Sequence, residues 1–216
     1  MIMIEFILWI IVDISLFFIA SFFLLRFLKE KEKPSEFFFF SIFFFFICTA
    51  VQRLLSLIFD FFISDLFLLF LLTLINIISA IPLLFHLERT VLHSKQIFSI
   101  VVFIFVGVYF GVYLIMGYDR YFMYFIFTPA YAIVVGVPGL IYLYLLVKSS
   151  GSVRTSLFLI IIGIGLVLVF WGMHGQYGRS ALEPATEYVD LIGVVAPLGY
   201  LVGLVLLAIG FFKKRV

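Results

Sequence analysis

Residues 4–33 read IEFILWIIVDISLFFIASFFLLRFLKEKEK, an apolar run of helical length that ends in a cluster of four basic residues. A bilayer core about 30 Å thick is crossed by about 20 apolar residues in a helix, so this run predicts a first transmembrane span. The run has no basic residue before it, which is the reverse of a cleavable signal peptide. Since basic residues favour the cytoplasmic side, we expect the run to begin outside and to end inside.

The same arrangement of charge recurs along the chain. Eleven of the fourteen Lys and Arg residues lie in four clusters, which occupy every second gap between the apolar runs. The clusters are Arg26, Lys29, Lys31 and Lys33; Arg89 and Lys95; Lys148 and Arg154; and Lys213, Lys214 and Arg215. This alternation predicts that these gaps and the C-terminus are cytoplasmic.

The composition also indicates a membrane protein. Of the 216 residues, 66% are hydrophobic and 12% are charged, which is more apolar surface than a soluble domain of this size can bury. We therefore expect an all-α, polytopic integral membrane protein of seven transmembrane helices, forming one domain over residues 1–216 in the cell membrane. The predicted spans are residues 4–28, 36–62, 65–87, 96–117, 121–147, 155–176 and 188–212. With the N-terminus outside, seven spans place the C-terminus in the cytoplasm.

The charges and the single cysteine restrict the partners. The net charge is +2, and the basic clusters lie beside the spans, which favours contact with an anionic lipid leaflet over binding of nucleic acid. Besides the lipid bilayer, a protein partner could bind the basic cytoplasmic loops. One cysteine, Cys48, excludes an intramolecular disulfide.

Small residues four positions apart predict where helices approach closely, because they let two backbones come together in lipid. Three such pairs occur within predicted spans. They are Gly107 with Gly111, Ala132 with Gly136, and Gly199 with Gly203. Packing between helices of the same chain is the favoured interpretation, and a homodimer is the alternative.

Polar residues at membrane depth form the candidate site. At about 1.5 Å per residue, Asp13 and Asn76 lie near the bilayer midplane, and Arg53, with Gln52 beside it, lies about 24 Å from the cytoplasmic start of its span. An ion at this depth costs at least ~2.5–3.5 kcal/mol, so Arg53 is expected to pair with a carboxylate or to extend towards the outer surface. Its candidate partners are Asp13, Asp60 and Asp190. Such a network could be a structural clasp or a ligand or proton site.

A second polar stretch, from Trp171 to Arg179, ends the sixth predicted span. It combines His174 and Gln176 with aromatic residues and glycines, which let a backbone approach a ligand closely. An aromatic belt at the membrane interface, followed by a loop, is the alternative interpretation. Together the two polar regions predict a pocket in the outer half of the bilayer, formed by Asp13, Arg53, Asn76, His174, Gln176 and Asp190.

Several function classes have no counterpart in the sequence. The last span, Tyr188–Phe212, contains no lysine, which excludes a retinal Schiff base there, and we expect no cofactor. The chain has no Gly-rich phosphate loop, no Ser nucleophile elbow and no Cys/His metal cluster, so we expect neither an enzyme nor a metal site. His86 and His93 are seven residues apart, and the segment around Glu88 is predicted to be a solvated basic loop.

Residues 36–212 resemble the seven-helix membrane sensor region that precedes some histidine kinases. The resemblance rests on helix number and size, on the exit of the fifth span through Tyr142, Tyr144 and Leu145–Lys148, and on the compact last helix. Arg154 at the entry of the sixth span, with Gly163 and Gly165 inside it, is also similar. The chain reaches Val216 without a kinase domain, so the resemblance implies signalling through a separate partner.

These observations lead to a receptor-like or sensory membrane protein as the expected function. A small secondary transporter or proton-linked carrier that uses Asp13 and Arg53 is the main alternative. An accessory subunit whose spans pack against a larger complex is the third. The apolar sequence on the cytoplasmic side of Asp13 and Asn76 favours a site closed from that side, and hence a sensor.

Overall fold

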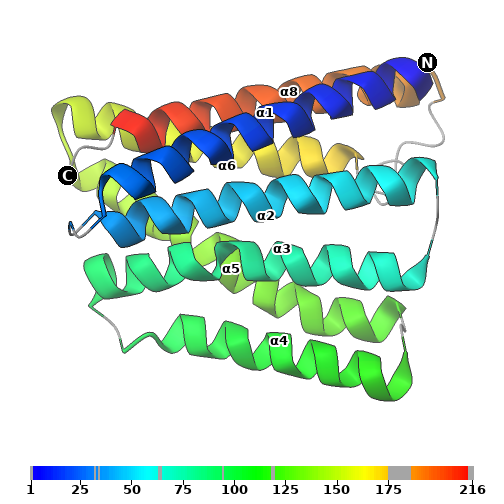
Figure 1. The fold of residues 1–216 in the computed structure, drawn as a ribbon, viewed down its shortest axis with the longest axis horizontal. Helices are drawn as coiled ribbons and strands as arrows, with labels where there is room; N and C mark the ends of the chain where they lie inside the picture. Colours follow the sequence, from blue (N-terminus) through cyan, green and yellow to red (C-terminus); the bar gives the residue numbers. More distant parts are fainter. Residues whose placement is uncertain are drawn as a thin grey trace. The chain divides into compact units, whose positions relative to one another are not determined.

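The computed structural model describes residues 2–31, 33, 35–62, 65–93, 95–117, 120–174 and 186–213 (Figure 1). Within these residues the chain folds into seven α-helices. The helices are α1 (Ile2–Lys29), α2 (Glu36–Phe61), α3 (Leu66–Leu87), α4 (Ile97–Met116), α5 (Arg120–Lys148), α6 (Gly151–His174) and α8 (Thr186–Lys213). A π-helical segment, η1 (Glu88–Leu92), extends α3. The prediction of an all-α fold is confirmed for the part of the chain that is described.

Six of these helices are long and apolar enough to cross a membrane. Their apolar stretches are Met3–Lys29, Glu36–Phe61, Leu66–Leu92, Ile97–Met116, Gly151–Met173 and Leu191–Phe212, and in α5 a shorter stretch, Ala132–Lys148, is described. The chain is therefore a helical, multi-pass membrane protein.

The predicted spans coincide with the helices, except that α6 begins at Gly151 instead of residue 155. Apolar length predicts where a helix crosses lipid, but α6 starts with a polar turn that includes Arg154. Gly151 has a φ of 61°, a left-handed conformation that glycine adopts readily, and this allows the chain to turn directly into the helix.

The helices group into two compact units. The central unit comprises Leu16–Ile141, and the terminal unit comprises Met1–Ser15 together with Tyr142–Val216. The first half of α1 thus belongs to the terminal unit and its second half to the central unit.

In the central unit, α3 packs against α2 on one side and against α4 on the other (Figure 1). An apolar core joins α3, α4 and α5; its buried members are Ile77, Ala80, Ile81, Leu84, Val102, Ala130 and Val134. An aromatic stack continues the contact between α3 and α4, where the Phe70 ring lies 5.2 Å from that of Tyr109 and 3.9 Å from that of Tyr113. Van der Waals packing of these apolar and aromatic side chains holds the three helices together.

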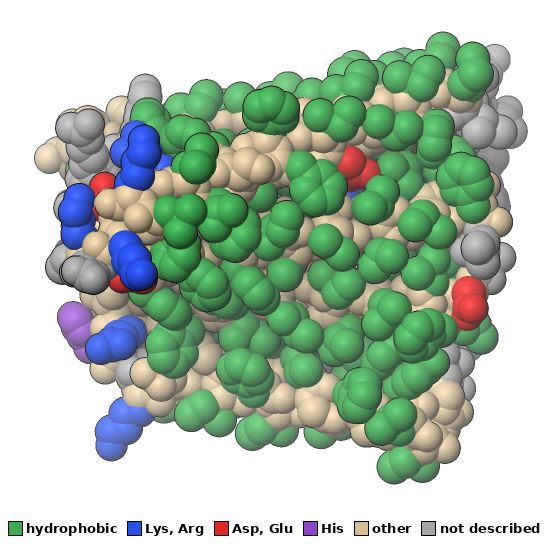
Figure 2. Space-filling view, viewed as in Figure 1, with side chains coloured by type: hydrophobic (Ala, Val, Ile, Leu, Met, Phe, Trp, Pro, Cys, Tyr) green, Lys and Arg blue, Asp and Glu red, His purple; other side chains and the backbone are tan. Residues whose placement is uncertain are grey.

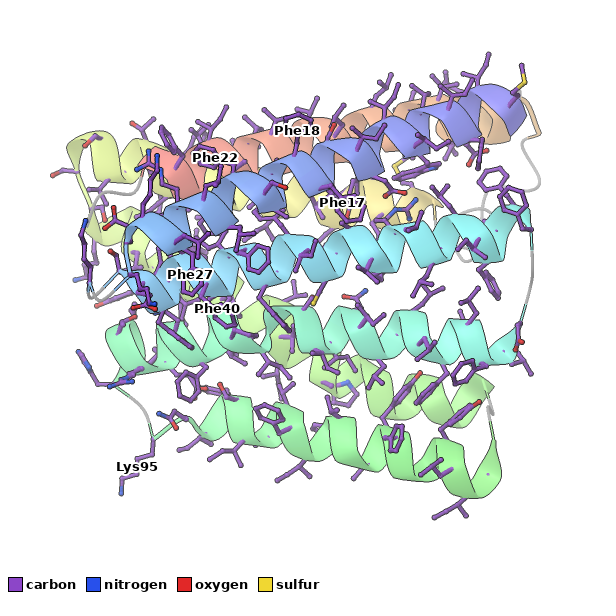
Figure 3. The ribbon with its side chains drawn as sticks, viewed as in Figure 1. Phe17, Phe18, Phe22, Phe27, Phe40 and Lys95 are labelled. Atoms are coloured by element: carbon purple, nitrogen blue, oxygen red, sulfur yellow. The ribbon has the colours of Figure 1, made fainter. Side chains whose placement is uncertain are left out.

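The second half of α1 packs against α2 through phenylalanine rings. Phe23 stacks on Phe46 at 5.7 Å between ring centroids, and Phe27 lies 5.6 Å from Phe40 (Figure 3). Since residue numbers rise along α1 as they fall along α2, the two helices are antiparallel. Phe18, which is 76% exposed, and Phe22 project from the opposite side of α1, where an apolar surface suits lipid (Figure 3).

In the terminal unit, α6 and α8 pack closely in antiparallel orientation. Gly210 lies against Ile160 and the Ser156 carbonyl, and Gly203 lies against Val167 and the Gly163 carbonyl. The first half of α1 runs parallel to α8, because Glu5 lies at Gly193 and the Trp9 ring lies 5.7 Å from that of Tyr200.

Basic residues gather at one end of each unit. In the central unit, Lys and Arg residues lie at the end of α1 and in the segments that join α1 to α2 and α3 to α4, which are at the same end of the unit (Figure 2). Asp65 begins α3 at the other end. In the terminal unit, Lys148, Arg154 and Lys213 lie where α5 ends, α6 begins and α8 ends, and the beginning of α1 lies at the opposite end.

Candidate functional site

Arg53 is a fully buried arginine within the apolar helix α2. Its side chain is 0% exposed, and neighbouring Gln52 is also buried. Arg53 lies eight residues before Phe61, or about 12 Å from that end of the helix, and about 26 Å from its start at Glu36. The sequence predicted this position within the helix, and the structure adds that the side chain is buried in protein. Its depth in the bilayer stays a prediction.

Of the three predicted carboxylate partners of Arg53, Asp60 is exposed and lies further along α2. Its Oδ2 accepts a hydrogen bond of 3.2 Å from the Ser56 hydroxyl. Asp13 belongs to the terminal unit. Asp190 lies within α8, and its side chain is outside the described residues. The pairing of Arg53 with Asp13, Asp60 or Asp190 therefore stays a prediction.

The terminal unit holds two buried carboxyl groups on one face of α1. Asp13 is 5% exposed and Glu5 is 8% exposed. Trp9 lies midway between them in sequence and is fully buried against Tyr200. Residues four apart share a helix face, so Glu5, Trp9 and Asp13 form one stripe. Glu5 was not among the predicted site residues, although this i, i+4, i+8 spacing of polar residues and tryptophan could have indicated it.

The other predicted pocket residues are distributed over both units. Asn76 is half-buried in α3, and its backbone carbonyl accepts a hydrogen bond of 2.7 Å from the Ser79 hydroxyl. His174 is the last residue of α6, and its side chain is not described; Gln176 lies outside the described residues. The grouping of Asn76, His174 and Gln176 with the other pocket residues therefore stays a prediction.

The small-residue pairs differ in their surroundings. A Cβ added at Gly203 would lie 2.9 Å from the Val167 nitrogen of α6, and one at Gly199 would lie 2.2 Å from the Phe170 ring. At Gly107, Gly111 and Gly136, by contrast, a Cβ would meet nothing within 4 Å among the described residues, and Ala132 is exposed. The Gly199–Gly203 pair therefore lies in a tight helix contact.

Glu88 shows that the prediction of a solvated loop was wrong for this residue. Its side chain is 0% exposed, and its carboxylate accepts hydrogen bonds from the N–H groups of Phe98 and Ser99 at 2.9 and 2.8 Å and from the Ser99 hydroxyl. The first N–H groups of a helix have no acceptor within the helix, and a carboxylate suits them and the positive end of the helix dipole. Glu88 is thus the N-terminal cap of α4.

The residues around Glu88 are also held by local contacts. The His86 ring lies 5.2 Å from that of Phe38 and 6.0 Å from that of Phe37, so α2 covers the end of α3. His93 and Gln96 adopt left-handed conformations with φ of 49° and 61°. Within the described residues, no group of three or more His, Cys, Asp or Glu side chains could hold a metal ion.

Among family models, curated proteins and solved structures, comparison with this chain found no match.

Proposed function

We propose that this chain is a receptor-like sensory membrane protein of seven transmembrane helices. Its N-terminus lies outside and its C-terminus in the cytoplasm. The site that responds to a ligand lies in the outer half of the bilayer at Arg53, and the basic cytoplasmic loops contact a separate signalling partner. The resemblance of residues 36–212 to the sensor region of some histidine kinases supports this proposal.

The burial of Arg53 is the observation that carries the proposal. A charged side chain is costly inside a membrane, so one that is present there usually serves a site. Arg53 is fully buried about 12 Å from the end of α2, with Gln52 buried beside it. A guanidinium offers five N–H donors in a planar fork that matches carboxylates and other oxyanions. A small organic acid or inorganic oxyanion is therefore the ligand class that fits this residue.

The packing of the central unit towards its basic end favours a sensor over a carrier. The apolar core of α3, α4 and α5 fills this region, from Ile77 to Leu84 in α3 and at Val102 in α4. The buried polar side chains of the same region have local partners: Ser41 donates to the carbonyls of Phe37 and Pro82, and Glu88 accepts from α4. A carrier needs a path to both sides, whereas a sensor needs a site open to one.

The positions of the basic residues support the assigned topology. The α1–α2 and α3–α4 connections, the α5–α6 connection and the end of α8 all carry Lys or Arg. Loops rich in these residues stay on the cytoplasmic side. The same loops provide positive charge for an acidic surface on a signalling partner.

Ligand binding and transport distinguish the two leading functions. Purified protein is mixed with acetate, succinate, glutamate and phosphate, and the shift in unfolding temperature is measured for wild type, Arg53→Gln and Arg26→Gln. We expect one of these anions to stabilise wild type and Arg26→Gln but not Arg53→Gln, without anion uptake into proteoliposomes. Uptake that is lost in Arg53→Gln would establish a carrier. Absence of stabilisation by a wider panel of anions would leave a structural role for Arg53.

A proton-linked carrier is the second candidate, and the buried carboxyl groups of α1 favour it. Glu5 and Asp13 are both more than nine-tenths buried in the terminal unit, and proton-linked carriers use carboxylates at such positions. Proteoliposomes that enclose a pH-sensitive dye test this candidate. Acidification that depends on an added organic acid and is lost in Asp13→Asn would favour the carrier and contradict the sensor.

A further inference from the structure

Within the terminal unit, the carboxyl group of Glu5 lies close to the backbone of α8 at Gly193. A Cβ built on Gly193 would lie 3.0 Å from Oε2 of Glu5, 3.3 Å from its Cδ and 3.7 Å from its Cβ. The side chain of Glu5 thus lies along the backbone of α8, in space that is open because residue 193 has no side chain. Glycine allows this close approach of a carboxyl group to a helix backbone.

Pro197 takes away the usual helical donor of a carbonyl in the same turn of α8. Proline has no N–H group, so Pro197, which lies inside α8, removes the hydrogen bond that residue 197 would donate to the carbonyl of Gly193. In a membrane such a carbonyl needs another donor, because lipid offers none. Among the described side chains, the carboxyl group of Glu5 lies at this turn, beside Gly193.

We propose that Glu5 is a proton-binding site, in which the protonated carboxyl group donates a hydrogen bond to the backbone of α8 at Gly193. An ionised carboxylate only accepts hydrogen bonds, whereas a protonated one has an O–H donor. The ionised carboxylate of Glu5 and the carbonyl of Gly193 are both acceptors and cannot bond to each other. After Glu5 takes up a proton from water, its O–H donates a hydrogen bond to this carbonyl. Release of the proton removes this donor and weakens the α1–α8 contact.

The position of Glu5 gives it access to water. It lies three residues after Ile2, or about 5 Å from the beginning of α1, so protons reach it from the aqueous phase at that end. The inference concerns the terminal unit and holds for either a sensor or a carrier, so it can be tested apart from the proposed role of Arg53.

Other titratable groups of this unit must be separated from Glu5. On its own helix, Asp13 is buried two turns further along, and on α8 Tyr200 is buried beside Trp9. Glu187, Tyr188 and Asp190 precede Gly193 on α8, and His174 ends α6; the side chains of these four residues lie outside the described part of the chain. Tyr142 at the start of this unit's part of α5 is buried.

Trp9 provides an internal reporter for the proton. It lies one helical turn from Glu5 and one turn from Asp13 on the same face, and the second tryptophan of the chain is Trp171. In a Trp171→Phe, His174→Gln background, the fluorescence therefore reports on Trp9 alone, and the titration of His174 is removed. Emission is measured across the pH range in lipid nanodiscs, with N-methylglucamine as the cation.

The variants make the test specific for Glu5. We expect the background protein to show a single pH transition and Glu5→Gln to give the low-pH emission at every pH, because a glutamine amide donates as the protonated acid does. Asp13→Asn, which changes a carboxyl group at the same distance in sequence from Trp9, should keep the transition. A transition that persists in Glu5→Gln, or is lost in Asp13→Asn alone, would overturn the proposal.

Pro197→Ala tests the acceptor. Alanine restores an N–H donor to the Gly193 carbonyl, so the protonated form of Glu5 loses its partner, and the midpoint should fall by about one pH unit, the size expected for one hydrogen bond. An unchanged midpoint would refute the assigned acceptor. Replacing N-methylglucamine by sodium should leave the midpoint in place, since a shift with sodium would identify a metal cation as the ligand instead of a proton.

Discussion

Glu88 and Ser99, eleven residues apart, are joined by two hydrogen bonds that connect the end of α3 to the first turn of α4. The backbone N–H of Ser99 donates to Oε2 of Glu88 at 2.8 Å, and the Ser99 hydroxyl donates to the same oxygen. Phe98 donates its N–H to the other carboxylate oxygen at 2.9 Å. The buried side chain of Glu88 therefore holds the first turn of α4 at the end of the α3–α4 connection.

Glu88→Ala should destabilise the protein more than Glu88→Gln. Alanine leaves the N–H groups of Phe98 and Ser99 without their acceptor, and loss of a helix cap costs about 1–2 kcal/mol. Glutamine keeps one oxygen acceptor but loses the charge that interacts with the helix dipole. The unfolding temperature in detergent measures the effect. Glu30→Gln, which changes an acidic residue in the α1–α2 connection, is the control, and equal unfolding temperatures for Glu88→Ala and wild type would show that Glu88 is not the cap.

The glycine contact between α6 and α8 predicts a second difference in stability. At Gly163 a Cβ would lie 2.8 Å from the Gly203 carbonyl oxygen and 2.8 Å from the Leu207 nitrogen, which are backbone atoms that cannot move aside alone. Gly163→Ala and Gly203→Ala should therefore each cost about 1–3 kcal/mol by overpacking. Gly111→Ala has open space around it and should change the unfolding temperature little. A larger loss in Gly111→Ala than in Gly163→Ala would contradict this packing.

The sequence was informative about the helices because lipid imposes a simple rule on them. A helix that crosses the bilayer is predominantly apolar over about 20 residues, so the runs around Phe18 and Arg53 predicted these two helices and the position of Arg53 within α2. Arg53 is fully buried, as expected of a charged side chain inside an apolar helix, which must be enclosed by protein or reach water. The position of a residue along its helix is a local property of the chain and could therefore be predicted.

Contacts between helices depend on partners that are distant in sequence, and these could not be predicted. Glu88 stands beside Arg89 in a segment whose charges predict a basic loop. Its burial becomes apparent only from its hydrogen bond with Ser99 at the start of α4. Likewise, Gly203 was found by its spacing from Gly199, but its partner Gly163 has no small residue four positions away. A close helix contact needs complementary surfaces on two elements, and the sequence pattern of one element does not show the other.

Glu30 gives the α1–α2 connection a weak dependence on pH. Its carboxylate lies 3.1 Å from Nζ of Lys33 and accepts a hydrogen bond of 3.2 Å from the Ser35 hydroxyl, and the Lys33 hydrogen bond holds the pKa of Glu30 below its ordinary value of 4.5. A lowered pKa in the folded state means that this stabilisation is present above about pH 4.5 and is lost as the pH falls through the lower, folded value. Unfolding temperatures of wild type and Glu30→Gln should therefore differ slightly at pH 7 and converge in acid. A difference that grows as the pH falls would contradict the assigned contact.

The assigned topology predicts which connections a reagent outside the cell can reach. Cys48 is the single cysteine and lies inside α2, so Cys48→Ser gives a background without thiols. In this background Asp65→Cys, at the beginning of α3, should react with a membrane-impermeant maleimide on intact cells, because positive charge keeps the opposite end of α3 inside. Lys95→Cys, which projects from the α3–α4 connection (Figure 3), should react only after the membrane is opened. The reverse pattern would place the N-terminus in the cytoplasm and Arg53 in the inner half of the bilayer.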